Sequence, residues 1–416
     1  MKKIISIDLD IPDSIKTALN KLGKTEDLSF SPDHRKLALV GYLFNRILLL
    51  DIKVSKKKDK RQIVISNYLE ICSSSFKNPH GVAWINNKTI VVANRMGGAF
   101  LLALPSKSKA KDQNRVWLTP FRTLPPLTPK NTSADCVTAH AIGKGFYEIL
   151  LCSNNGHYIS SHLINTKQDF HVESSCILLK HKINVPDGVA LSDNRAWIAI
   201  SNHHSHTVFI YKNLKSLNPD TPPDAILHGL HFPHGIKFVE DTHFLFVSDA
   251  GGPFVYCYYS KTGEWSGHYQ PVSKFRVMHH ETFLKGHVNP QEGGVKGVAF
   301  FKNSYIMAVT CQEERLTFFD LSTIVSMHKS RSKPSKVIAL SLNDYFDRTL
   351  RCMQINQNSL MRAYQYQTKQ HRHEIDYLIK QHRQKLERLL SSKSWKITQP
   401  LRVINMYISR FKTFKF

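Results

Sequence analysis

One short phrase returns along this chain and limits its fold more than any other feature. Residues 78–83 read Asn-Pro-His-Gly-Val-Ala, residues 185–190 read Val-Pro-Asp-Gly-Val-Ala, and residues 232–237 read Phe-Pro-His-Gly-Ile-Lys. A copy without the proline occupies residues 295–299. In each copy a turn residue pair precedes an apolar run, and a second apolar run follows some residues later, which predicts paired β-strands.

The spacing of the copies indicates a repeat architecture. Two weaker copies centre on Asp27 and Cys136, so the phase markers fall at residues 27, 81, 136, 188, 235 and 297. Units of about fifty residues, each with several short strands, are typical of a β-propeller. A β-sandwich or a string of small domains does not explain the regular return of the phrase. We therefore predict an all-β fold, a six-bladed β-propeller with four-stranded blades, over residues 1–328.

The fifth copy shows how four strands fit into one unit. The inner strand is expected at 235–239, the second at 243–248, the third at 254–259, and the outer strand within 265–277. Two segments are alternatives for closing the ring as an added outer strand, residues 3–7 and residues 336–340. The charged runs at 56–61 and 106–112 are expected to be loops between strands.

Composition limits the setting and the partners. The formal net charge is +25, which favours an anionic partner such as nucleic acid, a membrane surface or an acidic glycan. The seven cysteines are scattered without a Cys-x-x-Cys pair, which favours a reducing compartment. The N-terminus lacks the apolar region of a signal peptide, and no run approaches the length of a membrane span. We expect a soluble cytoplasmic protein.

The character of the chain changes after residue 328. Residues 329–342 are interpreted as a polar linker or a last outer strand, and residues 343–416 as a basic helical tail. Apolar residues recur there at three-four spacing, but the stripe is interrupted by Gln and His, which suits a long exposed helix or a weak coiled coil. Residues 330–416 carry 18 Lys or Arg against 5 Asp or Glu, a net +13. About half of the net charge therefore lies in this tail.

The end of the tail is amphipathic. Bulky apolar residues share one face with Arg and Lys around it, a pattern that allows a helix to lie in a membrane interface. Packing on the propeller or on a partner helix is the alternative. The residues expected to dock on a membrane or protein are Trp395, Arg402, Ile404, Tyr407, Ile408 and Phe411.

The repeated phrase also predicts a site. Inner strands of a propeller run parallel around a central channel, so residues at their starts gather at one mouth. The residues at this place are all ionisable: Glu26, His80, Asp135, Asp187, His234 and Lys296. A second set, from the ends of the second strands, lies behind them and includes Arg95, Asn154, Asn202, His203, His204 and Asp249. Carboxylates and amides suit calcium and histidines suit zinc or iron, so one divalent cation is a candidate. The alternative is that Asp and His before Gly cap a tight turn.

The blade phrase resembles the six-bladed propellers of the NHL-repeat and gluconolactonase-like (SMP-30) superfamily. In the gluconolactonase-like enzymes a divalent ion, often calcium, is held by Glu, Asn and Asp and polarises a lactone or ester. The resemblance implies Glu26, Asn154, Asp187 and Asp249 as the matching ligands. This chain departs from that pattern by placing His80, His234 and Lys296 at the mouth.

The tail is similar to a different group of proteins. Residues 389–402 read Leu-Leu-Ser-Ser-Lys-Ser-Trp-Lys-Ile-Thr-Gln-Pro-Leu-Arg. This signature resembles the C-terminal segment of bacterial glycosyltransferases and methyltransferases of cell-surface glycan assembly. It implies a bacterial setting in polysaccharide biosynthesis, peripheral to the inner membrane. Nothing upstream reads as a nucleotide-sugar-binding domain.

Three functions follow from these observations. The first is a propeller that binds a glycan or small molecule at its channel mouth and docks through its tail to a membrane or protein partner. The second is a metal-dependent lactonase or esterase. The third is RNA binding, which would be strongly salt-dependent. We rank the third last, and do not expect a nucleic-acid partner, because the charge is concentrated in the tail rather than on the blades.

Overall fold

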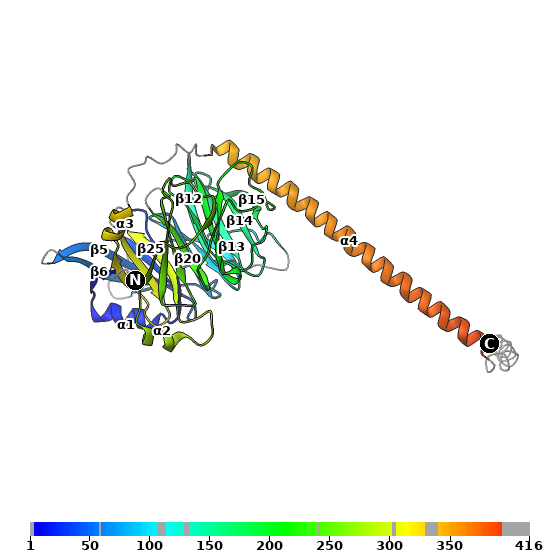
Figure 1. The fold of residues 1–416 in the computed structure, drawn as a ribbon, viewed down its shortest axis with the longest axis horizontal. Helices are drawn as coiled ribbons and strands as arrows, with labels where there is room; N and C mark the ends of the chain where they lie inside the picture. Colours follow the sequence, from blue (N-terminus) through cyan, green and yellow to red (C-terminus); the bar gives the residue numbers. More distant parts are fainter. Residues whose placement is uncertain are drawn as a thin grey trace, which may run out of the picture. The chain divides into compact units, whose positions relative to one another are not determined.

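The computed structural model describes residues 4–57, 60–105, 114–128, 133–239, 242–301, 305–328 and 340–392. Their strands form six sheets arranged as the blades of a propeller, so the predicted fold is confirmed (Figure 1). The inner strand of each blade faces the channel, and the three further strands follow outward. The six inner strands are β3 (Thr25–Phe30), β7 (Pro79–Asn86), β12 (Val137–Gly143), β16 (Pro186–Leu191), β20 (Pro233–Val239) and β25 (Val295–Phe301).

In each blade the second strand pairs antiparallel with the inner strand, and the third strand pairs antiparallel with the second. They are β4 (Lys36–Gly41) and β5 (Arg46–Lys57), β8 (Thr89–Asn94) and β9 (Gly98–Ala103), β13 (Phe146–Ser153) and β14 (Tyr158–Asn165), β17 (Trp197–Asn202) and β18 (Thr207–Lys212), β21 (Phe244–Asp249) and β22 (Phe254–Tyr259), and β26 (Ile306–Cys311) and β27 (Thr317–Asp320). The outer strands are β6 (Lys60–Cys72), β11 (Arg122–Thr123), β15 (His171–Leu179), β19 (Ala225–Leu227), β24 (Ser273–Arg276) and, in the last blade, β1 (Ile5–Ser6).

The N-terminal strand closes the ring. β1 pairs antiparallel with β27, with Ile5 opposite Asp320 and Ser6 opposite Phe319. This decides between the two alternatives drawn from the sequence in favour of the first. Residues 336–339 of the other segment, and the whole of the expected linker up to residue 339, lie outside the described residues. The last blade thus combines strands from both ends of the propeller.

The repeated phrase forms a β-bulge at the start of the inner strands. The pairing register shifts across Glu26, His80, Asp187, His234 and Lys296, so each is an extra residue between two paired positions. A bulge re-aims the side chain of its extra residue. At each bulge an ionisable side chain therefore points away from the sheet, while the rest of the inner strand stays paired with the second strand.

The glycine of the phrase allows neighbouring blades to approach closely. A Cβ atom on Gly81 would lie 2.6 Å from the carbonyl oxygen of Asp135, and one on Gly188 would lie 2.0 Å from that of His234. On Gly235 it would lie 2.7 Å from that of Lys296. Each glycine therefore makes room for the backbone of the ionisable residue in the next blade.

The core lies between the blades. Both faces of the second strands are covered, and every residue of β8, β17, β21 and β26 is buried. This explains why these strands read as continuous apolar runs rather than as alternating ones. One cluster joins the first two blades through Leu49 and Trp84, and another joins the fifth and sixth through Phe246 and Met307.

Several elements differ from the expectation. Strands β5 and β6 continue to Lys57 and from Lys60, so most of the charged run expected as a loop forms a long hairpin that extends from the ring (Figure 1). The second charged run, 106–112, lies outside the described residues. Three short strands extend blades: β2 (Asp8–Asp10) and β10 (Arg115–Trp117) lie beside β6, and β23 (Gly267–Tyr269) lies beside β19. Helices α1 (Asp13–Lys21), α2 (His280–Gly286) and α3 (Ser322–His328) were not expected.

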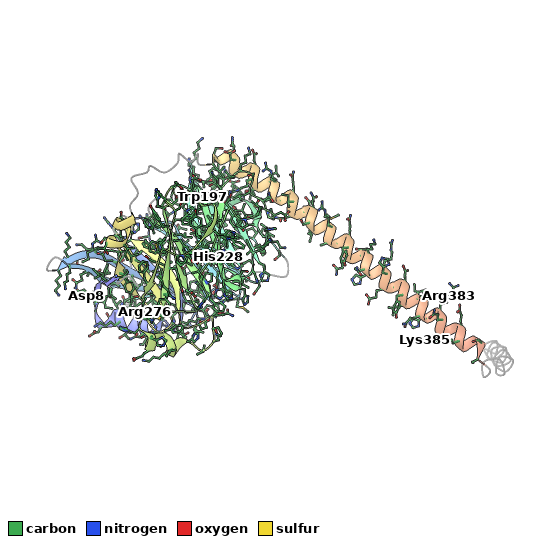
Figure 2. All side chains as sticks on the ribbon, viewed as in Figure 1. Asp8, Trp197, His228, Arg276, Arg383 and Lys385 are labelled. Carbon is green, nitrogen blue, oxygen red and sulfur yellow. The ribbon has the colours of Figure 1, made fainter. Side chains whose placement is uncertain are left out.

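Helix α4 (Leu342–Ser391) is the last element of the described part of the chain. The first compact unit spans residues 1–355 and includes the first turns of α4, and the second unit spans residues 356–416. In the second unit the side chains of residues 357–385 are exposed, and those of Arg383 and Lys385 stand away from the helix (Figure 2). No described helix is long and apolar enough to span a membrane. The docking residues expected at 395–411 lie outside the described residues.

The first turns of α4 are held by a buried ion pair. Arg348 donates hydrogen bonds to the carboxylate of Glu148 in β13 and, at 2.6 Å, to Oδ1 of Asn213. Its guanidinium also lies 4.7 Å from the ring centroid of Tyr345. The side chains of Arg348 and Glu148 are 1% and 0% exposed. This helix start is therefore part of the propeller's packing rather than a separate tail.

Candidate metal centre in the channel

The ionisable residues of the inner strands meet near the channel axis. His80, Asp187, His234 and Lys296 each lie within 3.8 Å of a charged partner from another blade, and Glu26 is common to three of these contacts. Asp135 is joined to the same centre through the backbone N–H of Asn154. The six residues named from the sequence are all between 0% and 5% exposed.

The imidazole of His80 has a defined proton arrangement. Its Nδ1 lies 3.2 Å from the backbone carbonyl oxygen of Asp135, and a carbonyl only accepts, so Nδ1 carries the hydrogen. Burial lowers the pKa of His80 to about 3, against the opposing effect of Glu26 and Asp187, so the ring is neutral at pH 7. Its Nε2 therefore presents a lone pair, and no hydrogen-bond donor meets that buried atom.

The Nε2 lone pair of His80 faces two carboxylates. Oε2 of Glu26 is 3.6 Å away and Oδ1 of Asp187 is 3.7 Å away. His234 repeats the arrangement from the other side, with Nε2 at 3.4 Å from Oε2 of Glu26 and 3.5 Å from Oδ2 of Asp187. The two distances from His80 are too long for hydrogen bonds. The Nε2 lone pair of His80 thus meets two carboxylates, an arrangement that is repulsive without a cation between them.

Two lysines balance the charge of Glu26, one near each carboxylate oxygen. Lys24 lies 2.9 Å from its Oε1, while Lys296 lies 3.8 Å from its Oε2 and 3.4 Å from Glu292. Burial alone would raise the pKa of Glu26, but Lys296 and the other partners hold it well below its usual range. Lys296 also donates to the carbonyl oxygen of Gln291 at 3.2 Å. The lysine at the mouth is therefore neutralised by Glu292 rather than left to repel a cation.

Asp187 is the carboxylate that three histidines surround. Its Oδ1 accepts a hydrogen bond from the side-chain amide of Asn154 at 3.0 Å, and His203 Nδ1 lies 3.5 Å from its Oδ2. Burial alone would raise the pKa of Asp187, but the neighbouring histidines and the charge of Arg95 hold it well below its usual range. Asp135, by contrast, pairs with Arg95 at 3.0 Å, yet burial raises its pKa to about 7. Asp187 therefore stays ionised, and an ionised buried carboxylate beside imidazole nitrogens is a suitable ligand for a cation.

A second ring of side chains reaches across the blades. In four of the six blades the residue just after the second strand contacts the inner residue of the following blade: the Tyr42 ring contacts His80, Arg95 pairs with Asp135, Asn154 bonds Asp187, and the His203 ring contacts His234. Arg95, Asn154 and His203 belong to the set expected behind the mouth. Tyr42 was missed, although its position after a second strand is the signal that would have found it.

Other members of the second set serve the backbone. Asp249 accepts the N–H groups of His231, Phe232 and Gly251, and Asn202 Oδ1 accepts that of Asn184. Apart from that of Gly251, these N–H groups belong to the segment that leads into the phrase proline of the same blade. Both side chains are engaged in turns, and among the described contacts neither meets the histidines of the centre. The ligand role that the resemblance implies for Asp249 therefore has no geometric support.

Two residues of the centre escaped the sequence reasoning. Lys24 comes from the segment between α1 and β3, and Glu292 comes from the loop between α2 and β25. They pair with each other at 2.8 Å and cover the centre on this face. Their nearness in sequence to Glu26 and Lys296 was the available signal. Because the centre is covered, it is a buried polar core rather than an open mouth.

The residues present fit a divalent cation. Two ligands of one tetrahedral ion lie about 3.4 Å apart when each bond is about 2.1 Å long. The distances from Oε2 of Glu26 to the two Nε2 atoms, 3.6 and 3.4 Å, match this spacing. The ligand atoms of Glu26, His80 and His234 lie within 4.8 Å of one another, as do those of His80, Asp135 and Asp187. Two imidazoles with carboxylates favour a transition metal over calcium.

Comparisons with known proteins assign the chain to no family. No protein-family model matches the chain, and no curated protein matches it. A solved luciferin-regenerating enzyme aligns over 72% of this chain and 93% of its own, with a TM-score of 0.47 and 12% sequence identity. The superfamily suggested by the blade phrase remains a resemblance.

Proposed function

We propose that this propeller is a metal-binding protein that holds one divalent transition-metal ion on its channel axis and presents it to a small ligand. The ligands are His80, His234, Glu26 and Asp187. One observation carries the proposal: the buried Nε2 of His80 presents a lone pair to two carboxylates and has no hydrogen-bond partner. Such an unpaired set is costly unless a cation fills it.

The surrounding residues prepare the centre. The carbonyl of Asp135 orients His80, as a partner on the far nitrogen does for metal-ligating histidines. Asn154 orients Asp187, and Lys24 restrains the outer oxygen of Glu26. A divalent ion held there would polarise a carbonyl or phosphoryl oxygen of a bound ligand. A lactonase or esterase would need this chemistry, and ligand binding without turnover would use it equally.

Metal analysis of the purified full chain tests the proposal. We expect about one equivalent of zinc, iron, manganese or a similar ion, and a fall to less than about one tenth in His80→Gln and in His234→Gln. The matched control is His204→Gln, because His204 lies in the same channel-face loop as His203 but is exposed. Ion-free protein that gains no thermal stability on addition of zinc, iron(II), manganese or calcium would refute the proposal.

The cellular setting remains a separate proposal. Association with bacterial surface-polysaccharide synthesis, and docking to a membrane or protein partner, are supported only by the sequence and charge of the tail. The residues that carry the tail signature lie mostly outside the described part of the chain. Neither the metal centre nor the fold depends on this setting.

A further inference from the structure

A cavity of about 270 Å³ fills the channel beyond the metal centre. In three blades the first residue that lines the cavity directly follows a residue of the metal centre along the chain. These lining residues are Asp27, Cys136 and Gly235. It continues to residues of two strand-connecting turns, His34 and Asp193, on the opposite face of the ring. The cavity therefore joins the inner side of the centre to the face on which the inner strands end.

The opposite ends of the channel differ in access. On the face where the inner strands start, the ion pairs of Lys24 with Glu292 and of Arg95 with Asp135 lie over the centre. The metal-capable side chains are almost fully buried under them. A small molecule would thus reach the centre from the cavity side. At about 30 Å³ for each water, the cavity has room for about nine waters, which suits a small ligand rather than a chain.

The charges in the cavity favour an anion. Lys237 is the lysine that lines it, it is half-buried, and it has no hydrogen bond or ion pair among the described residues. Its ammonium is therefore available to an anion that enters the cavity. His140 stands on the inner strand β12, two blades from β20, with Nε2 at 2.8 Å from Thr138 Oγ1. Burial, followed by the nearby charges of Lys237 and Arg195, lowers the pKa of His140 to about 3, so its ring is a neutral hydrogen-bonding group.

The acidic groups of the cavity do not satisfy Lys237. Asp27 uses one carboxylate oxygen to accept the N–H of Leu28 at 2.8 Å and the other to accept that of Val82 at 3.1 Å. Asp193 is exposed at the turn that forms the rim. Neither lies within ion-pair distance of the Lys237 ammonium among the described contacts.

We propose that this cavity is the ligand pocket of the protein, that it admits small anions from the face where the inner strands end, and that Lys237 holds the anionic group. The shared chemistry is a carboxylate or phosphate on a small polar molecule. The inference deepens the proposed function by placing the ligand next to the metal centre. It does not require the metal for its test, because anion binding by Lys237 is measured directly.

A cysteine in the cavity wall provides the probe. Cys136 lines the cavity and is partly exposed, whereas the other six cysteines are buried. Thiol reagents of equal size but opposite charge, a sulfonatoethyl and a trimethylammonioethyl methanethiosulfonate, report the local potential through their relative rates. In the native full chain we expect the anionic reagent to modify Cys136 about threefold faster or more, measured by mass spectrometry. That preference should disappear in Lys237→Met and persist in Lys237→Arg.

Competition identifies the anion class. Tartrate and inorganic phosphate, at matched ionic strength, should slow the modification of Cys136, and the uncharged mannitol should not. Protection by tartrate alone would identify the bound group as a carboxylate, and protection by phosphate alone would identify it as a phosphoryl group. Cys136→Ser should abolish labelling, and Lys180→Met, an exposed lysine outside the cavity, should leave the rate ratio unchanged. An unreactive Cys136, an unchanged ratio in Lys237→Met, or absence of protection by either anion would overturn the inference. Normal metal content in Lys237→Met would show that the metal centre stands independently.

Discussion

Removing the guanidinium of Arg348 should destabilise the whole propeller, although Arg348 belongs to the C-terminal helix. Glu148 lies in the middle of β13 with its side chain 0% exposed, and Arg348 is its charged partner. Arg348→Met keeps most of the volume but leaves a buried carboxylate facing Ser161 alone among its described partners. Breaking a buried ion pair by removing one partner costs about 3–5 kcal/mol of folding free energy. We take this cost to include the loss of the hydrogen bond to Asn213.

The expected shift in melting temperature follows from the size of the unit. An unfolding entropy of roughly 2.1 cal/mol/K per residue over residues 1–355 gives about 0.75 kcal/mol/K. A loss of about 4 kcal/mol then lowers the melting temperature by about 5 °C. Thermal unfolding followed by near-ultraviolet circular dichroism measures this directly, with the metal content held constant because a bound ion shifts the transition.

A second variant separates the ion pair from general packing. Replacing both partners, Arg348→Met with Glu148→Met, removes both buried charges, so the double variant should recover most of the loss. Arg383→Met is the exposed control, since its side chain is 81% exposed and its contact with Glu387 is 3.9 Å, and it should change stability by less than about 0.5 kcal/mol. A shift below about 1 °C for Arg348→Met, or a double variant less stable than it, would refute the reasoning.

Two further predictions concern the backbone of the ring and the boundary of the propeller. Gly188→Ala should lower the melting temperature by several degrees, because its Cβ would lie 2.0 Å from the carbonyl oxygen of His234, whereas Gly97→Ala meets only the flexible side chain of Lys77 at 3.3 Å and should have little effect; equal melting temperatures for the two variants would contradict the close-approach argument. A chain ending after residue 355 should keep the melting transition and the metal, whereas one ending before residue 342 should lose several degrees with Arg348. If the chain that ends after residue 355 stays folded but no longer sediments with membranes, the docking role of residues 356–416 gains support. If the chain that ends before residue 342 melts at the same temperature as the chain that ends after residue 355, the helix start is not part of the propeller.

The fold was predictable because the residues that repeat along the chain have a structural role. The phrase glycines permit close approach of neighbouring inner strands, and the spacing of the phrase therefore predicts the number of blades. The additions were not predictable in the same way, since β2, α1 and α2 lie outside the repeat. Helix α1 carries only two buried apolar residues, Ile15 and Leu19, which is too short a stripe to identify without its neighbours. The two candidates for ring closure were equally short and apolar, and only the pairing with β27 separates them.

The sequence predicted which residues of the inner strands meet at the candidate site. It did not predict which charged residues from the loops neutralise them. The position before each phase marker identified Glu26, His80 and Asp187 because the bulge recurs at the start of these inner strands. What no pattern could supply is how Lys24 and Glu292, from loops without repeats, cover the centre. The proton position on His80 also depends on a backbone carbonyl from the next blade, a contact that exists only in the assembled ring.

The pairing of β1 with β27 has a consequence for biosynthesis. Synthesis at roughly 5–20 residues per second places Asp320 about 15–60 s behind its partner Ile5. During that interval β1 has no partner strand in the last blade, and the growing array of blades keeps an unpaired edge that attracts other strands. The pairing of β1 with β27 is therefore expected to be a late step of folding, and chaperone dependence should be greatest before it.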